Sequence, residues 1–373
     1  MRIIIAPQEY KGTLSAREAA EALAAGARHA APAAQIELIP LSDGGPGLID
    51  AVLASLPGRL LRTRVEDPLG RPVEAAWALL DDGSAVIEMA AAAGLILLAE
   101  EERDPRIAST YGVGQLLRAA VDAGCRSLIV GAGGSATNDG GAGMASALGA
   151  RFLDGEDREL PPGGAPLSRL RHIDTGRLDE RLAGCRIVAA TDVVNPLCGP
   201  EGASLVYGPQ KGASPDIAGE LDAALRRYGE IIERDLRVVV LDVPGAGAAG
   251  GLGAGLIAFC RAEVCPGFDV VAAATRLPER LPGAHLVLTG EGRLDGQTAF
   301  GKTIARLARL ARGSGVPLIA IPGSLGAGWQ SVLELVDRVE PTSAGDGTDP
   351  SAALAAAAQR AVAAWLAADS RQP

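Results

Sequence analysis

Four polar, glycine-rich loops follow predicted β-strands and contain most of the residues that could do chemistry. They occupy residues 6–13, 131–141, 191–199 and 289–296. Loops at strand ends are where α/β proteins often place binding and catalytic groups, because the packed scaffold holds such loops in position. These four loops are therefore the first candidates for a functional site.

The loop at residues 131–141 has the composition of a phosphate-binding loop. It reads Gly-Ala-Gly-Gly-Ser-Ala-Thr-Asn-Asp-Gly-Gly. Glycines let the backbone approach an anion closely, and successive N–H groups beside a helix start attract a phosphate. A structural turn is the alternative, but the hydroxyl and amide groups favour a ligand. The predicted cofactor-binding residues of this loop are Gly133, Gly134, Ser135, Thr137, Asn138 and Asp139.

Three of the loops carry an aspartate near the end of a predicted strand, namely Asp139, Asp192 and Asp295. With phosphate nearby, such carboxylates could hold Mg²⁺, which takes one or two carboxylates together with phosphate oxygens. One of them could instead accept the proton of a substrate hydroxyl. For each aspartate the alternative is a structural role in a turn or a helix cap.

The basic residues are almost all arginine. The chain has 32 Arg and only three Lys, and each Lys is next to a glycine: Lys11, Lys211 and Lys302. Lysine presents a compact, rotatable ammonium group that the planar guanidinium of arginine does not reproduce. We therefore expect at least two of the three to be functional. Chance is the alternative for all three, and Lys211 could be a solvated loop residue.

Residues 296–303 match the P-loop pattern Gly-x-x-x-x-Gly-Lys-Thr. A P-loop should leave a strand directly and enter a helix. Here the predicted strand ends at Thr289 and several residues intervene, so we do not expect a P-loop NTPase. Lys302, at a predicted helix start, can still point at a phosphate without that fold.

Both ends of the chain alternate predicted strands and helices, which is typical of a parallel sheet covered by helices. A strand at residues 2–6 precedes a helix that starts at Ser15, where Glu18 completes a capping box. Near the other end, strands at 285–289 and 316–321 are separated by a helix.

The middle of the chain differs, because short strands and turn sequences between residues 59 and 89 indicate an antiparallel meander. The predicted fold is α/β with two domains. One is a doubly wound parallel-sheet domain built from residues 1–65 and 285–373, and the other is a mixed α/β domain inserted at 66–284. The active site is expected in the cleft between them, at the carboxyl ends of parallel strands.

Composition argues against several classes of protein. The formal net charge of −10 does not favour nonspecific binding to nucleic acid or to an anionic membrane. The first residues lack a signal-peptide pattern, and the uncharged stretch at 243–260 has too many glycines for a membrane span. Five cysteines without paired spacing suit a reducing cytoplasm, and the three histidines lack metal-ligand spacing.

Long strings of residues connect these loops to one family. The strings are Gly-Gly-Ser-Ala-Thr-Asn-Asp-Gly-Gly-Ala-Gly-Met at 133–144, Asn-Pro-Leu at 195–197, Tyr-Gly-Pro-Gln-Lys-Gly-Ala at 207–213, Pro-Gly-Ala-Gly-Ala-Ala-Gly-Gly-Leu-Gly at 244–253 and Gly-Glu-Gly-Arg-Leu-Asp at 290–295. In order and spacing, over essentially the whole chain, the sequence resembles the bacterial glycerate kinases of glyoxylate and glucarate breakdown.

The resemblance implies transfer of the γ-phosphoryl group of ATP to D-glycerate with Mg²⁺, with 2-phosphoglycerate favoured as product over 3-phosphoglycerate. It implies small-molecule partners, ATP and glycerate, with a homodimer left open. Lys11 would neutralise the glycerate carboxylate or the moving phosphoryl group. Asp192 is the first choice for base or metal ligand, and Asp295 is the second. The other assignments are Gly290, Glu291 and Lys302 for the nucleotide, and Gln8, Glu9, Asp43, Gly44, Asn195, Lys211 and Arg293 for the substrate.

The first loops depart from the family pattern together. The family typically reads Ala-Pro-Asp-Ser-Phe-Lys-Gly and Asp-Gly-Gly-Glu-Gly-Thr there, and it usually has a second acid two positions after Asp192. The residues that stand here instead are Gln8, Glu9, Tyr10, Pro46, Leu48 and Val194. We expect the same reaction with Glu9 in place of a missing acid. The alternatives are a kinase for a related small hydroxy acid and a catalytically silent ligand-binding paralogue.

Overall fold

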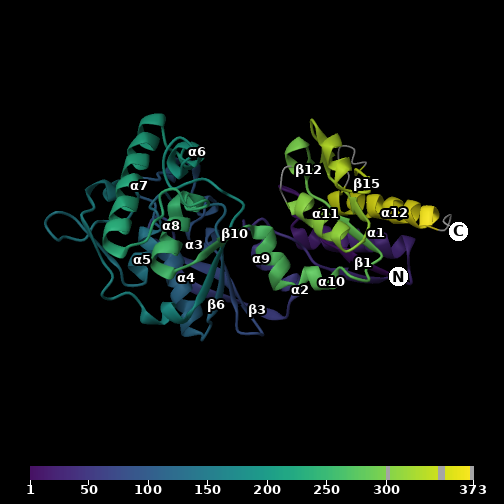
Figure 1. Cartoon of the computed structure of the whole chain (residues 1–373), viewed down its shortest axis with the longest axis horizontal. Helices are drawn as coiled ribbons and strands as arrows, with labels where there is room; N and C mark the ends of the chain where they lie inside the picture. The colour runs from purple at the N-terminus through teal and green to yellow at the C-terminus, as the bar shows by residue number, and fades with distance from the viewer. Residues whose placement is uncertain (300–302, 343–348, 370–373) are drawn as a thin grey trace. The chain divides into compact units, whose positions relative to one another are not determined.

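The computed structural model describes residues 1–299, 303–342 and 349–369. The chain forms two compact units (Figure 1). The terminal unit consists of Met1–Asp43, Asp50–Pro57 and Phe268–Pro373, and the central unit consists of Gly44–Ile49 and Gly58–Gly267. The predicted α/β fold class, with a parallel sheet from both chain ends and a mixed sheet from the middle, is confirmed.

The terminal unit is built on a five-stranded sheet whose strand order reverses beside β1. β1 (Arg2–Ile5) pairs in parallel with β2 (Gln35–Leu38) on one side and with β11 (Leu286–Thr289) on the other. β13 (Leu318–Ala320) and β15 (Arg338–Val339) extend the sheet beyond β11. The loops after β1 and β11 therefore flank a topological switch point, which is where open α/β sheets bind ligands.

Helix α1 (Ala16–Ala30) begins at the predicted capping box. Ser15 Oγ accepts a hydrogen bond from the Glu18 amide at 3.2 Å, and Glu18 Oε2 accepts one from the Ser15 amide at 2.8 Å. These bonds satisfy two amide groups near the helix start, where intrahelical partners are lacking.

The two chain ends, purple and yellow in Figure 1, share one core because α1 packs against α12 (Pro350–Asp369). Gly26 lies where these helices approach, and a Cβ added there would overlap the carbonyl oxygen of Ala355. Among the described helices, α12 alone is long and apolar enough to cross a membrane by length and composition. Its Leu354 and Val362 are buried in the core that it forms with α1.

The other terminal-unit elements are short or lie near the unit boundaries. They are α2 (Leu48–Ser55), α9 (Gly267–Ala274), α10 (Leu277–Arg280), α11 (Thr303–Gly313), β12 (Arg293–Leu294) and β14 (Ser324–Leu325). β12 and β14 pair with each other in parallel.

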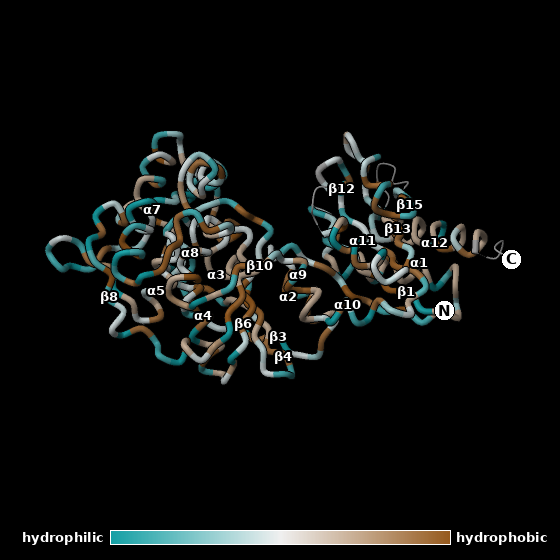
Figure 2. Tube along the Cα trace, in the orientation of Figure 1, coloured by the Kyte–Doolittle hydropathy of each residue, from teal (hydrophilic) through white to brown (hydrophobic). Residues whose placement is uncertain are grey.

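The central unit is built on a six-stranded mixed sheet, in the order β10-β9-β6-β5-β4-β3. Its first four strands in this order are parallel, and its last two form the predicted antiparallel meander with β5. Figure 2 shows hydrophobic residues along these strands, whereas hydrophilic and hydrophobic residues alternate along α7. The strands are β3 (Gly58–Glu66), β4 (Pro72–Leu80), β5 (Ala85–Glu88), β6 (Ser127–Gly131), β9 (Arg186–Ala190) and β10 (Glu263–Cys265).

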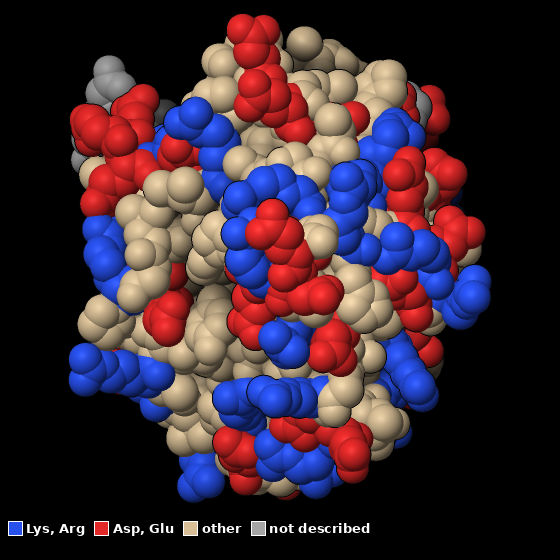
Figure 3. Space-filling model, turned by 90° about the vertical axis from the view of Figure 1, so that its left-hand side faces the viewer, with Lys and Arg blue, Asp and Glu red and all other residues tan. Residues whose placement is uncertain are grey.

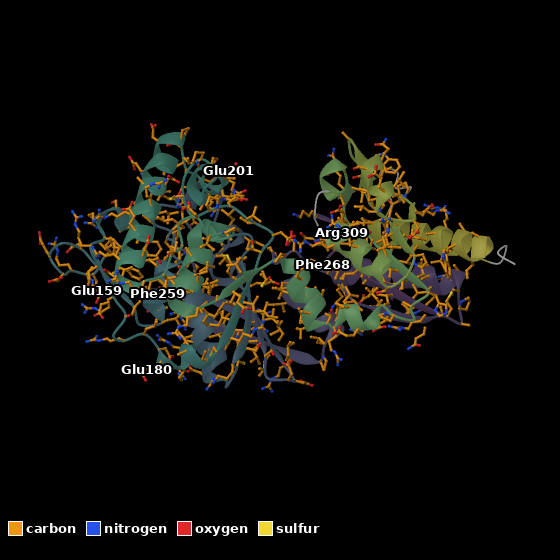
Figure 4. All side chains as sticks on the ribbon, in the orientation of Figure 1. Glu159, Glu180, Glu201, Phe259, Phe268 and Arg309 are labelled. Atoms are coloured by element: carbon orange, nitrogen blue, oxygen red, sulfur yellow. The ribbon has the colours of Figure 1, made fainter. Side chains whose placement is uncertain are left out.

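Helices and a small hairpin complete the core of the central unit. They are α3 (Ala90–Ala93), α4 (Tyr111–Asp122), α5 (Ala142–Ala147), α6 (Ala203–Tyr207), α7 (Pro215–Leu236), α8 (Ala248–Cys260), β7 (Arg151–Leu153) and β8 (His172–Asp174). Phe259 of α8, labelled in Figure 4, packs edge-on against Phe152 of β7 with ring centroids 5.7 Å apart. Phe152 also contacts Tyr228 of α7, so helices and hairpin share these aromatic rings.

The unit boundaries differ from the predicted positions at residues 65 and 285. β3 pairs with β4 over its whole length, from Gly58 opposite Leu80 to Glu66 opposite Pro72, and therefore belongs to the central sheet. The terminal unit resumes at Phe268, labelled in Figure 4, whose side chain is buried. Local sequence patterns do not reveal such boundaries, because pairing between distant strands decides them.

Acidic and basic side chains are interspersed on the face drawn in Figure 3. In the central unit many are paired, for example Arg151 with Glu159 at 2.6 Å and Arg158 with Asp154 at 3.1 Å. On that face the described residues form no extended basic field of the kind that a nucleic acid backbone attracts.

Replacing Gly26 with alanine tests the close contact between α1 and α12. We expect Gly26→Ala to lower the free energy of unfolding by about 1–3 kcal/mol, because the added methyl group overpacks the helix contact. The matched control is Gly219→Ala, at an exposed position within α7 where a Cβ meets nothing within 4 Å. That change should stabilise the chain by about 0.5–1 kcal/mol, since alanine favours helix. Urea unfolding measures both; equal effects would disprove the packing argument.

Candidate active site

The loops after β1 and β11 lie side by side at the switch point of the terminal sheet. The Gln8 amide donates a hydrogen bond to the carbonyl oxygen of Gly290 at 2.9 Å. A Cβ at Gly292 would lie 3.1 Å from the Lys11 amide nitrogen, so the backbones touch where glycine has no side chain. The structure thus brings together two predicted segments, the substrate loop at Gln8–Lys11 and the nucleotide residues Gly290 and Glu291.

Tyr10 is a structural residue of this loop that sequence reasoning did not assign. Its hydroxyl donates a hydrogen bond to the carbonyl oxygen of Ile321, just after β13, and its ring is buried. Burial and the nearby Glu291 both raise the pKa of Tyr10, so its hydroxyl stays protonated. Tyr10 therefore ties the loop after β1 to the end of β13, while the next residue, Lys11, is exposed.

Three charged side chains of the terminal unit interact near this strand end: Glu9, Lys11 and Asp43. Lys11 is exposed, whereas Glu9 and Asp43 are partly buried. Burial raises the pKa of Glu9, the positive charge of Lys11 lowers it, and the negative charge of Asp43 raises it again. An acid with a raised pKa beside an exposed ammonium group is suited to proton transfer or to anion recognition.

The segment after β11 holds its own polar groups in a tight turn. Thr298 Oγ1 donates a hydrogen bond to Glu291 Oε1 at 2.8 Å and accepts one from the Asp295 amide at 3.3 Å. Asp295 is partly buried and Arg293 is exposed. Lys302, predicted to bind phosphate, lies outside the described residues.

In the central unit, the loop at Gly44–Gly47 lies against the carboxyl ends of β6 and β9. A Cβ at Gly131 would lie 2.7 Å from the Gly44 carbonyl oxygen, and one at Gly133 would lie 2.6 Å from the Gly45 Cα. Gly44 has a positive φ of 87°, and a Cβ there would overlap the Ala190 carbonyl oxygen. Residues 44–47 therefore lie beside the glycine-rich loop at 131–141 in the central unit. The sequence analysis had placed residues 44–47 in the terminal domain.

Glu88, at the end of β5, holds this loop in place. Its Oε1 accepts hydrogen bonds from the Gly47 amide at 3.0 Å and the Ile49 amide at 2.8 Å. Sequence reasoning missed Glu88, although an acid that ends a buried apolar strand is a recognisable signal. The ring of Pro46 lies near Gly134, where a Cβ would be 3.2 Å from its Cγ, so this substitution places an apolar group beside the predicted phosphate loop.

Asp139 organises the glycine-rich loop from inside the fold. It is fully buried, and its carboxylate accepts hydrogen bonds from the Thr110 amide and hydroxyl, both at 2.8 Å. The amides of Gly141 and Gly143 donate to it as well, at 3.1 and 3.2 Å. Burial raises the pKa of Asp139, while these hydrogen bonds act in the opposite direction. These hydrogen bonds give Asp139 a structural role, and its predicted contact with a ligand stays a prediction.

Thr137 and Asn138 are also buried, with no exposed surface. Asn138 Nδ2 donates a hydrogen bond to Ser204 Oγ at 2.8 Å. Among the described residues, Thr137 Oγ1 and Asn138 Oδ1 have no hydrogen-bond partner. Ser135 is buried as well, whereas Gly133 is partly exposed and Gly134 is exposed, so backbone amides rather than these side chains are the candidates for phosphate contact.

Lys211 is buried as well, although the sequence analysis assigned it to the substrate. Only 1% of it is exposed, and its Nζ donates a hydrogen bond to the Thr137 carbonyl oxygen at 2.7 Å. Burial lowers the pKa of Lys211 to about 7, and the negative charge of Asp139 opposes this shift. The ammonium group is used inside the fold, and the predicted substrate contact stays a prediction.

Asp192 and Asn195 follow β9. Asp192 is exposed, and its Oδ1 accepts a hydrogen bond from the Gly267 amide at 2.9 Å. Asn195 is held at both ends, since its Nδ2 donates to the Glu201 carbonyl oxygen at 2.7 Å and its Oδ1 accepts from the Tyr207 hydroxyl at 2.9 Å. Glu201 is labelled in Figure 4. These bonds give Asn195 a structural role, whereas Asp192 still faces solvent.

Within the described chain, no group of three or more His, Cys, Asp or Glu residues could hold a metal ion. Mg²⁺ does not require such a group in kinases, because one or two carboxylates act together with substrate phosphates. Asp192 in the central unit and Asp295 in the terminal unit fit the carboxylate part of that donor set. Each would then be a ligand only together with phosphate oxygens.

Comparison with known proteins extends these observations. A sequence model of the glycerate kinase family matches residues 3–366. The chain is 48% identical to the glycerate kinase of Halalkalibacterium halodurans, covering 89% of this chain and 88% of that protein. It is 47% identical to the glycerate 2-kinase of Escherichia coli, covering 87% of this chain and 86% of that protein.

A solved structure agrees with these sequence comparisons. The crystal structure of a protein assigned as glycerate kinase 2 from Salmonella typhimurium LT2 matches with a TM-score of 0.91 and 44% identity. The match covers 99% of each chain. The chain described here therefore belongs to the glycerate kinase family.

Proposed function

We propose that this chain transfers the γ-phosphoryl group of ATP to a hydroxyl of D-glycerate, with 2-phosphoglycerate as the product. The observation that carries the proposal is the similarity to glycerate kinases over nearly the whole chain. The name of the Escherichia coli relative, glycerate 2-kinase, supports the 2-phosphate.

The nucleotide phosphates are assigned to the backbone of residues 133–135. Gly134 has a positive φ of 73°, a backbone conformation that aims successive amides at an anion. When bound, ATP with Mg²⁺ supplies the phosphoryl group and neutralises its charge. Asp192 supports the metal or accepts the glycerate proton, and Asp295 is the second choice for either task. Gly290 and Glu291 complete the nucleotide assignment.

The acceptor is assigned to the loop after β1. The exposed ammonium of Lys11 neutralises the carboxylate of glycerate or the moving phosphoryl group, because a compact positive charge suits either. Glu9, whose pKa burial raises, takes the place of the acid that Gln8 has replaced. Gln8, Arg293 and the adjacent pair Asp43 and Gly44 contribute polar contacts to the substrate from three loops.

A related small hydroxy acid is the second candidate substrate. The observation that favours it is the loss of three acidic positions of the family pattern, at Gln8, Pro46 and Val194, while Lys11 and the glycines stay. Pro46 lies beside Gly134, so one of these changes lies next to the predicted phosphate loop.

Release of ADP with a panel of hydroxy acids tests the proposed activity. Turnover with D-glycerate supports it, and turnover only with another acid supports the second candidate. Ligand binding without turnover on any acid would indicate a catalytically silent paralogue. Phosphorus NMR of the product distinguishes 2-phosphoglycerate from 3-phosphoglycerate.

We propose a cytoplasmic enzyme that acts on small molecules and needs neither nucleic acid nor a membrane. All five cysteines are free, which suits a reducing compartment. A homodimer is compatible with the proposal, and sedimentation of the purified chain measures it.

Removing the Lys11 ammonium group should greatly reduce turnover. We expect Lys11→Ala to lower kcat by about 10²–10³-fold, which is the usual cost of deleting one preorganised charge or donor at a reacting group. The matched control is Arg17→Ala, an exposed basic position on α1. Turnover of Lys11→Ala within twofold of the wild type would remove Lys11 from the site.

The raised pKa of Glu9 predicts a shifted acid limb in the pH profile. A carboxylate that must be ionised loses its charge as pH falls through its pKa, so kcat/KM should begin to fall at a pH above the ordinary range of a glutamate. In Glu9→Gln the rate should be lower and this limb absent. Glu21→Gln, at an exposed position on α1, is the control. The same acid limb in Glu9→Gln would assign the titration to another group.

A further inference from the structure

Two opposite charges, Lys211 and Asp139, are buried in the central unit beside the glycine-rich loop. Lys211 is 1% exposed and Asp139 is fully buried. Removing an ion from water costs several kcal/mol even after relaxation, and a well-packed apolar pair is often equally stable. Packing alone therefore does not explain why a lysine is buried at position 211. The contacts of Lys211 indicate a second role.

The side chain of Lys211 contacts the backbone of the glycine-rich loop. It ends a short 3₁₀ turn at Pro209–Lys211, and its Nζ donates to the carbonyl oxygen of Thr137 at 2.7 Å. The next residue, Gly212, has a φ of 94°, and a Cβ there would overlap the Arg103 carbonyl oxygen. The backbone that follows Lys211 is thus packed tightly against Arg103, which holds the start of the Lys211 side chain in position.

Asp139 and Lys211 hold the loop at two neighbouring points, in addition to a backbone bridge in which the Ala136 amide donates to the Ala93 carbonyl oxygen and the Leu95 amide donates to the Gly134 carbonyl oxygen, both at 2.9 Å. Asp139 fixes one point through the Thr110 amide and hydroxyl and the first residues of α5. Lys211 fixes the other point at Thr137. Between these points Asn138 Nδ2 donates to Ser204 Oγ, whereas Thr137 Oγ1 and Asn138 Oδ1 have no partner among the described residues.

Residues 133–136 lead directly into the point that Lys211 holds. The backbone amides of residues 133–135 are the groups assigned above to the nucleotide phosphates, whereas the Ala136 amide donates to the Ala93 carbonyl oxygen at 2.9 Å. A shift of the Thr137 carbonyl would rotate the preceding peptide units, because each peptide plane is rigid and only φ and ψ can absorb the change. An error of about 1 Å in such positioning can cost about a hundredfold in rate or binding.

We propose that Lys211 is a positioning residue for the nucleotide: its ammonium group fixes the Thr137 carbonyl, and through it the amides of residues 133–135 that receive the phosphates of ATP. Lys211 does not touch the nucleotide. The inference rests on the kinase function proposed above, and it predicts an effect on nucleotide binding that is separate from glycerate binding.

Calorimetric titration of Lys211→Met with ATP and Mg²⁺ tests this inference without requiring turnover. We expect ATP to bind about 10–100-fold more weakly, because the loop loses its restraint. KM for ATP should rise in parallel, while KM for glycerate stays within about twofold. Gln210→Met, at the exposed neighbouring position in the same turn, is the matched control and should bind ATP as the wild type does.

Removal of one buried charge could unfold the chain, so a second variant accompanies the first. Lys211→Met with Asp139→Asn removes both charges, and Asp139→Asn alone is its reference because Asp139 also holds the loop. Weaker ATP binding by the folded double variant than by Asp139→Asn supports the positioning role. Normal ATP binding by folded Lys211→Met, equal ATP binding by the double variant and Asp139→Asn, or an equal loss for ATP and glycerate, overturns it. If the wild type binds ATP but does not phosphorylate glycerate, the proposed function fails while the inference stands; if the wild type does not bind ATP, both fail.

Discussion

At the carboxyl ends of the parallel strands, glycines lie so close to neighbouring segments that a Cβ would not fit. The candidate site residues depend on these close contacts for their positions. A Cβ at Gly290 would overlap both the Tyr10 hydroxyl and the Ile321 carbonyl oxygen. In the central unit, a Cβ at Gly44 would overlap the Ala190 carbonyl oxygen. In each unit, parallel strands bring the loops to the same edge of that unit's sheet, and glycine lets the loops touch there.

The close contacts determine which side chains are left to act. Where the backbone is held by its neighbours, a side chain is not needed to fix the loop and can face outward, as Lys11 does. Where a loop is tied to the end of a strand, a polar side chain provides the contact, as the buried Tyr10 and the partly buried Glu88 show. In each unit the loops at the strand ends are therefore closely packed backbone with few exposed charges, a suitable arrangement for a reaction that depends on positioning and charge neutralisation.

Local patterns predicted the elements well where a short stretch of chain is sufficient to form them. The capping box at Ser15 and Glu18 requires only four residues, and its hydrogen bonds are present. Within the stretch at 243–260, residues 249–251 adopt left-handed backbone angles before α8 continues as a buried helix. The boundary at residue 65 differs from the structure because β3 joins the central sheet through a partner strand that local propensity does not specify.

The sequence by itself determined which chemical groups are available: a glycine-rich loop suited to anions, a few carboxylates at strand ends and three isolated lysines. It also determined the family, because the family motifs occur in the same order over the whole chain. Only the tertiary structure decided which of these groups face inward. Asn138, Asp139 and Lys211 read as ligand contacts in the sequence, yet all three are buried and bonded to the fold. Loops have no periodic pattern from which burial could be read, so the packing of distant segments such as Thr110 and Ser204 against them settles the outcome.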